Sequence, residues 1–191
     1  MRHTRARRTS RNRLLTGGAV LAVLTAGGLG TVAANAADSP AQASATTAAV
    51  SGPARGELTR TTHLTLTAAT EAAQAAVDAA ERENQHVSVA VVDRNGNTLV
   101  TLRGDGAGPQ SYESAERKAF TAVSWNAPTS ELAERLKQAP NLKDIPGTLF
   151  LGGGAPVTAQ GAPVAGIGVA GAPSGDLDEK FARAGVAALG R

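Results

Sequence analysis

The stretch Ile145–Ala172, IPGTLFLGGGAPVTAQGAPVAGIGVAGA, holds the densest run of glycines in the chain, between two short apolar segments. Thr148–Leu151 predicts one strand and Val164–Ala170 predicts a second. The three glycines Gly152–Gly154 indicate a place where the backbone passes close to something else. Such a segment could line the binding site of a flat ligand, or it could form the core of a plain β-hairpin. These residues alone do not distinguish the two.

Further strands and helices are predicted on both sides of this stretch. Val87–Val92 is a β-branched run, Asp93–Asn97 contains an Asn-Gly turn, and Thr98–Leu102 supplies the returning strand of a hairpin. Alanines recur at helical spacing after Thr67, a candidate N-cap. Other helices are expected from Ser111 to before Pro128, from Thr129 or Ser130 to before Pro140, and from Ser174 to Leu189. Helices segregated from an antiparallel sheet make this an α+β domain.

The first 36 residues resemble a secretory signal peptide. Six arginines and no acidic residue occur there, an apolar run spans Leu14–Val32, and Ala34–Ala36 is an A-x-A cleavage pattern. A membrane-spanning helix is the alternative, but Gly17-Gly18 and Gly27-Gly28 interrupt the run and no stop-transfer charges follow. We therefore expect a secreted, extracellular protein cleaved after Ala36.

Removal of this leader changes the charge of the chain. Six of the 19 Lys and Arg residues lie in it, which leaves 13 against 16 Asp and Glu, a net charge of about −3. The mature protein therefore offers no basic surface for nucleic acid or anionic membrane. Residues 37–62 are rich in Ala, Ser, Thr, Pro and Gly and predict a flexible tether, and residues 63–191 suffice for one domain.

Several kinds of chemistry are excluded or disfavoured by composition. The chain has no Cys, so disulfides, thiolate ligation and Cys nucleophiles are excluded. Only His63 and His86 remain after the leader, and no G-x-S-x-G motif presents a serine nucleophile. Gly152–Gly154 lacks the Lys-Ser/Thr of a phosphate-binding loop. A hydrolase or a nucleotide-binding protein is therefore not expected.

Two acidic pairs have spacing that suits a metal ion. Glu113 and Glu116 form one, and Asp176 and Glu179 form the other. Carboxylates at i and i+3 share one face of a helix and suit a hard cation such as ferric iron. The pairs have an equally simple structural explanation, because acids in a first helical turn complement the helix dipole, Glu113 can pair with Arg117, and Asp176 to Glu179 resembles a capping box. Spacing alone leaves both open.

His63 stands between the tether and the first predicted helix, where an imidazole would be accessible to iron or haem. A solvated histidine without a function is the alternative. Thr148 does not by itself indicate a function, because threonine is common in strands for its β-branched side chain.

From Leu64 to Arg191 the sequence resembles the GlcG/HbpS family of small α+β domains. The motifs that carry the resemblance occur in the family's order: LTLTAATEAAQAAVDAA, VSVAVVDRNGNTLV, the DGAG loop, SAERKAFTAVSWNAPTSEL, and IPGTLFLGGGAPV followed by VAGIGVAGA. The resemblance implies a five-stranded antiparallel profilin-like sheet with flanking helices, and a compact homo-oligomer, an octamer. It also implies haem bound through the Thr148 hydroxyl, iron at Glu113, Glu116, Asp176 and Glu179, and His63 in the place of the family's N-terminal histidine.

The function that the resemblance implies is extracellular binding of ferric haem and iron. Such a protein buffers haem and modulates a membrane sensor histidine kinase in redox and iron sensing. Because the chain lacks Cys and its only Met is Met1, the ligands left for haem iron are oxygen or imidazole. Related domains with other roles leave two alternatives, a weak haem-dependent peroxidase or haem-degrading enzyme, and a domain that binds a corrinoid or a small organic acid.

Overall fold

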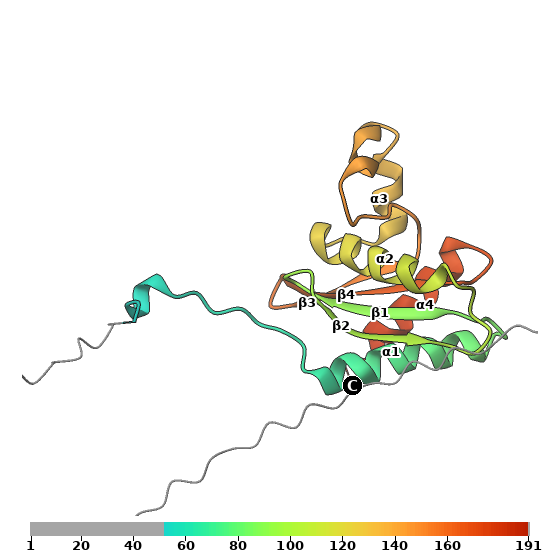
Figure 1. Cartoon of the computed structure of the whole chain (residues 1–191), viewed down its shortest axis with the longest axis horizontal. Helices are drawn as coiled ribbons and strands as arrows, with labels where there is room; N and C mark the ends of the chain where they lie inside the picture. Colours follow the sequence, from blue (N-terminus) through green and yellow to red (C-terminus); the bar gives the residue numbers. More distant parts are fainter. Residues whose placement is uncertain (1–51, 191) are drawn as a thin grey trace, which may run out of the picture. The chain divides into compact units, whose positions relative to one another are not determined.

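One antiparallel sheet of four strands forms the centre of the domain (Figure 1). Its strands are β1 (Ser88–Asp93), β2 (Thr98–Arg103), β3 (Gly154–Ala159) and β4 (Ala162–Ala170), in the order β2-β1-β4-β3. Every residue of β1 is buried, and β1 pairs with β4 from Ser88 opposite Ala170 to Asp93 opposite Ala165. The computed structural model describes residues 52–190 of the 191.

Helices cover both faces of this sheet (Figure 1). Alternate side chains of β1 face opposite helical layers. Val89 and Val91 pack with α1 (Leu66–Glu81) and α4 (Gly175–Ala188), whereas Ala90 and Val92 pack with α2 (Ser111–Trp125). This alternation follows from the two-residue period of a strand. The sheet is therefore buried on both sides, and the α+β prediction is confirmed.

Two glycines of β4 let α2 lie directly on the sheet. A Cβ atom built on Gly168 would lie 2.0 Å from Ala115 O, and one on Gly166 would lie 2.2 Å from Ala119 O. No residue with a side chain fits at these distances. In β4, Ala165, Ile167 and Val169 thus pack toward α1 and α4, whereas Gly166 and Gly168 present only backbone to α2.

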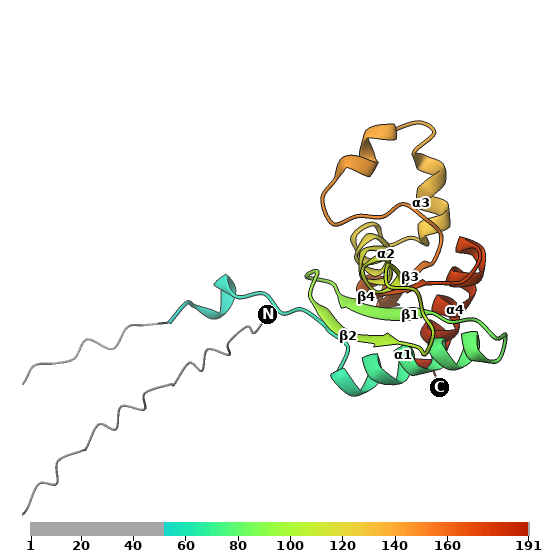
Figure 2. The same ribbon diagram turned by 45° about the vertical axis from the view of Figure 1, so that its right-hand side comes forward.

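Two smaller helical elements follow α2. They are α3 (Thr129–Arg135) and the 3₁₀ helix η2 (Pro140–Asp144), and Figure 2 shows them beyond α2, on the side away from α1. Leu132 of α3 packs with Ala127 and Phe150 in a small cluster of its own. This cluster connects α3 to the segment that carries Thr148.

The predicted hairpin and the four predicted helices are confirmed, with shifts at some ends. The first helix has Thr65 as its N-cap instead of Thr67, because the Thr65 side chain accepts a hydrogen bond from the Ala68 N–H at 3.2 Å. Pro128, not Thr129 or Ser130, holds the N-cap position of α3. The last helix begins near Ser174 as expected, and Ser174 is its N-cap, with Oγ accepting from the Leu177 N–H at 3.2 Å. The capping box suggested for Asp176 and Glu179 is therefore wrong.

The sheet has four strands and not five, and Thr148–Leu151 is a loop and not a strand. Its polar backbone groups are bonded by side chains of α2 instead of by a neighbouring strand: Leu149 N–H donates to Thr121 Oγ1, and Thr148 O accepts from Arg117. Gly152–Gly154 does pass close to other backbone, because a Cβ on Gly154 would lie 2.5 Å from Lys118 O. The close neighbour of Gly154 is thus the backbone of α2.

The segment 52–65 precedes α1 and contains a short 3₁₀ helix, η1 (Arg55–Glu57). Its residues are exposed except Leu64, which is half-buried. The expected signal peptide, residues 1–36, and most of the expected tether, residues 37–62, lie outside the described residues. Within residues 52–190, no helix is both long enough and apolar enough to cross a membrane.

Candidate functional site

Thr148 lies in the loop between η2 and β3. The residue is only 2% exposed, and its Oγ1 donates a hydrogen bond to Ile145 O at 2.8 Å. On either side of it, Ile145 and Leu151 are 39% and 57% exposed. The buried hydroxyl is therefore bordered by apolar side chains that face solvent.

Helix α2 holds the peptide that follows Thr148. Arg117 Nη2 donates to Thr148 O at 2.8 Å, and Leu149 N donates to Thr121 Oγ1 at 2.8 Å. The Thr121 hydroxyl in turn donates to Arg117 O at 2.7 Å. One residue further along, Phe150 packs edge-to-face on Trp125 with ring centroids 5.2 Å apart. The loop is thus attached to α2 by two hydrogen bonds and by the packing of Phe150 on Trp125.

The phenyl ring of Phe120 connects this loop to the β1–β2 turn. A Cβ on Gly147 would lie 3.5 Å from the ring, and a Cβ on Gly96 would lie 2.9 Å from it. His63 is at the same turn, with Nδ1 3.6 Å from Asp93 Oδ2 and Nε2 2.7 Å from Thr61 Oγ1. Phe120 thus lies between the segment that carries Thr148 and the β1–β2 turn, and His63 lies beside Asp93 at the start of that turn.

Asp93 organises that turn. Its Oδ1 accepts hydrogen bonds from the N–H groups of Asn95 and Asn97, at 2.8 and 2.9 Å. Burial raises the pKa of Asp93, but the hydrogen bonds from Asn97 and Asn95 and the nearby His63 outweigh it, so the pKa is below its ordinary value. Asp93 therefore stays ionised beside His63.

Glu113 and Glu116 lie together on the first turns of α2. The Glu113 side chain is 78% exposed and lies 3.9 Å from Arg117 Nη1. Glu116 is half-buried, and its Oε1 accepts from Thr101 Oγ1 of β2 at 3.1 Å. Glu113 has room for a cation, whereas Glu116 would share its carboxylate with Thr101.

Asp176 and Glu179 are placed in different surroundings. Asp176 is exposed, whereas Glu179 is buried and accepts from Ser130 N, Ser130 Oγ and Arg183 Nη2 at 3.0, 2.9 and 2.8 Å. Burial raises the pKa of Glu179, but these hydrogen bonds from Arg183 and Ser130 outweigh it and lower the pKa below 4.5. Glu179 thus joins α4 to the start of α3. Within residues 52–190, no three His, Asp or Glu side chains gather closely enough to hold a metal ion.

A buried ion pair is the feature that the sequence reasoning missed. Lys118 Nζ lies 2.7 Å from Asp178 Oδ2, and both residues are buried. Burial raises the pKa of Asp178, and the Lys118 charge offsets only part of this effect. The available signal was Lys118 itself, a lysine on the alanine face of α2 between Ala115 and Ala122.

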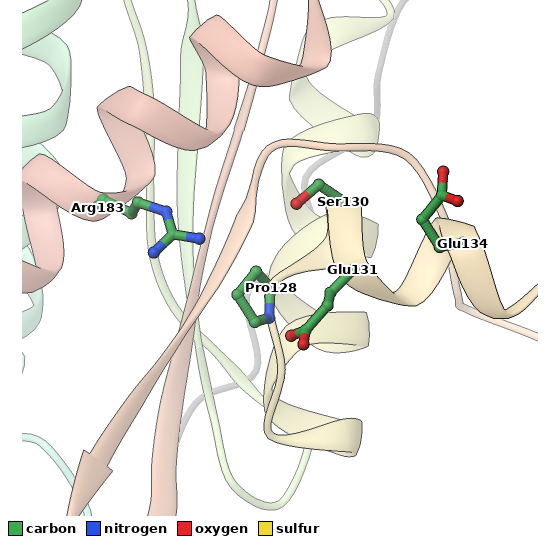
Figure 3. A pocket seen from close by; sticks show the side chains of 5 residues that line it. All are labelled: Pro128, Ser130, Glu131, Glu134 and Arg183. Atoms are coloured by element: carbon green, nitrogen blue, oxygen red, sulfur yellow. The ribbon is translucent and has the colours of Figure 1, made fainter.

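The surface also has a cavity of about 330 Å³ between α3 and α4 (Figure 3). Arg183 borders it from α4, and Ser130, Glu131 and Glu134 border it from α3, next to Pro128. A second cavity of about 330 Å³ shares Pro128 and Arg183 and is lined by Ala155, Pro156, Val186 and Ala187. Thr148 lines neither of them, so they do not extend the site around the loop.

A family model described as haem degrading protein HbpS-like matches residues 64–187. The chain belongs to the HbpS-like family. A double glutamate-to-aspartate mutant of Streptomyces reticuli HbpS has a solved structure that is 80% identical, with a TM-score of 0.73 over 75% of this chain and 99% of that chain. The match thus covers nearly the whole of that solved chain.

Two other relatives are more distant. A solved complex of PduOC with haem is 28% identical, with a TM-score of 0.61 over 66% of this chain and 95% of that chain. The corrinoid adenosyltransferase PduO of Salmonella typhimurium is 31% identical over 121 residues, which is 61% of this chain. This HbpS-like chain spans only 36% of the length of that enzyme.

Proposed function

We propose that this protein binds ferric haem through the Ile145–Leu151 loop, with the Thr148 hydroxyl as the iron ligand. The observation that carries the proposal is the 80% identity to a solved chain of a Streptomyces reticuli HbpS mutant, 99% of which the match covers. The complex of PduOC with haem supports it, because that protein has the same fold. Exposed Ile145 and Leu151 supply apolar surface of the kind that a porphyrin covers.

The side chains that could ligate iron in this protein suit a weakly bound haem. Without Cys, and with Met1 as the only Met, a hydroxyl or an imidazole is what remains for haem iron. A neutral hydroxyl is a hard ligand that favours ferric over ferrous iron and exchanges readily. These properties suit capture and release, and hence buffering.

Access to Thr148 requires a local movement, because its hydroxyl is buried and donates to Ile145 O. The turn that covers it contains Gly147 with φ of +79°. We expect the turn at residues 145–147 to open when haem binds, which frees the Thr148 oxygen from Ile145.

We further propose that the protein is secreted, assembles as an octamer and reports redox state to a membrane sensor histidine kinase. The leader-like residues 1–36 and the family membership support this. For iron, we retain Glu113 and Glu116. Glu179 is less suitable because Ser130 and Arg183 already surround its carboxylate.

Haem degradation is the second candidate function, favoured by the description of the matching family model. It predicts loss of the haem spectrum with hydrogen peroxide that depends on Thr148. Equal loss with free haem in buffer would contradict it. The PduO relative makes a corrinoid the third candidate ligand, tested by competition with haem.

The deciding experiment is a titration of ferric haem into the purified protein, followed by the Soret band. Thr148→Ala should bind haem more weakly and with a shifted band, whereas Thr148→Ser should retain the wild-type band. Thr158→Ala, at an exposed position of β3, is the matched control. If Thr148→Ala binds like wild type, the ligand lies elsewhere, and His63→Ala is the next variant to test.

A further inference from the structure

The peptide between Thr148 and Leu149 is bound at both edges by α2. Its carbonyl accepts from Arg117 Nη2 and its N–H donates to Thr121 Oγ1, each at 2.8 Å. Arg117 and Thr121 are one helical turn apart, and the Thr121 hydroxyl also donates to Arg117 O. A peptide plane held at both edges cannot rotate without losing a hydrogen bond.

These two contacts are the side-chain hydrogen bonds that tie the backbone of residues 145–151 to other elements, as far as the described part of the chain shows. The other backbone hydrogen bonds of the loop are local: Ile145 N–H donates to Leu142 O, and Thr148 N–H donates to Ile145 O. Phe150 adds packing on Trp125 at the end of the loop. The orientation of the Thr148 backbone therefore depends on Arg117 and Thr121.

We propose that Arg117 and Thr121 are positioning residues that set the direction of the Thr148 side chain for haem. This rests on the proposed function, in which the Thr148 hydroxyl is the iron ligand. The Cα of Thr148 belongs to the peptide plane that α2 holds, so this plane restricts where the hydroxyl can point when the turn at residues 145–147 opens. Neither Arg117 nor Thr121 has to touch the haem.

The test compares variants that differ in one hydrogen bond. Thr121→Val keeps the shape of the side chain and removes the acceptor for Leu149 N–H, whereas Thr121→Ser keeps the hydroxyl. Arg117→Gln removes the charge and shortens the reach to Thr148 O. We expect Thr121→Val and Arg117→Gln to weaken haem binding roughly tenfold and to shift the Soret band toward that of Thr148→Ala. Thr121→Ser should restore the wild-type band.

A second readout needs no haem. Trp125 is the only tryptophan and lies against Phe150, two residues after Thr148, so its emission reports on the loop. Thr121→Val should change this emission while circular dichroism shows a folded protein, and Thr121→Ser should not. Wild-type affinity, Soret band and emission in both Thr121→Val and Arg117→Gln would overturn the positioning role.

The outcomes separate the two proposals. If Thr148→Ala loses haem while Thr121→Val and Arg117→Gln bind as wild type, the positioning role fails and the haem ligand stands. If Thr148→Ala itself binds as wild type, the ligand assignment fails and the positioning role fails with it.

Discussion

Lys118 and Asp178 form a buried ion pair, 2.7 Å long, that joins α2 to α4. Lys118 Nζ also donates to Val169 O of β4, and Asp178 accepts from the Ala172 N–H, each at 3.0 Å. Helices on opposite faces of the sheet thus meet at the end of β4. A buried pair of this kind is tolerated because each charged group makes a further hydrogen bond to the backbone besides the ion pair.

Removal of one partner of this pair should be strongly destabilising. Lys118→Met leaves Asp178 buried without its counter-charge, and we expect a loss of about 3–5 kcal/mol in the free energy of unfolding. The double variant Lys118→Met with Asp178→Leu should recover part of this loss. Urea unfolding of the single and double variants measures the coupling, and additive losses would show that the two side chains are independent.

The lowered pKa of Glu179 predicts that stability depends on pH in a specific way. Its pKa in the folded protein is below the ordinary 4.5, so the unfolded chain takes up this proton at higher pH. The stabilising contribution is therefore complete above pH 4.5 and is lost as the pH falls through the lowered pKa. Glu179→Gln should cost about 1–3 kcal/mol at neutral pH and less in acid.

The measurement for Glu179 is the urea midpoint from about pH 7 to about pH 3, compared between wild type and Glu179→Gln. The difference between the two proteins should shrink as the pH falls. Asp93 acts in the same direction and Asp178 in the opposite one, but both are present in both proteins. The control is Glu131→Gln, at an exposed position of α3, and a pH-independent difference for Glu179→Gln would contradict the assignment.

Gly168 should be intolerant of any side chain. A Cβ there would lie 2.0 Å from Ala115 O, so Gly168→Ala must push α2 away from β4. We expect a loss of more than about 3 kcal/mol in stability, measured by thermal and urea unfolding. Gly190→Ala is the control, since a Cβ at Gly190 meets nothing within 4 Å. Similar stability of the two variants would show that α2 can shift freely.

Iron binding should depend on Glu113 and Glu116. We expect the double variant Glu113→Gln with Glu116→Gln to lose ferric iron in equilibrium dialysis. Glu131→Gln with Glu134→Gln is a matched control, because it removes a pair of the same spacing from α3. Equal iron retention by both double variants would exclude Glu113 and Glu116 as the site.

Iron at Glu113 should also weaken the contact between Arg117 and Thr148. Arg117 Nη1 lies 3.9 Å from Glu113 Oε1, while its Nη2 donates to Thr148 O. A cation on Glu113 repels the guanidinium at this distance. We therefore expect ferric iron to change haem affinity severalfold in wild type and not in Arg117→Gln. An equal change in both proteins would show that the effect bypasses Arg117.

Much of the fold was readable from local patterns. The Asn-Gly turn between two β-branched runs predicted β1 and β2, and the alanine spacing predicted the buried face of α1, because turn chemistry and the helical period act over a few residues. The candidate site was less readable. Thr148 was found only through family resemblance, whereas the position of His63 before the first helix had already made it a candidate. Nothing in the neighbours of Thr148 along the chain indicated that Arg117, Thr121 and Phe120 would lie around its segment.

Periodicity and motifs of contiguous residues were enough to predict the α+β class, the main helices, the hairpin and the family. That Thr148–Leu151 is a loop follows from long-range packing. An apolar run becomes a strand only where a sheet edge can bond its backbone, and here α2 side chains bond it instead. The roles of Lys118 and Glu179 likewise depend on tertiary contacts. Asp178 is 60 residues from Lys118, and Ser130 is 49 residues from Glu179. Contacts over such distances follow from packing, which no local pattern records.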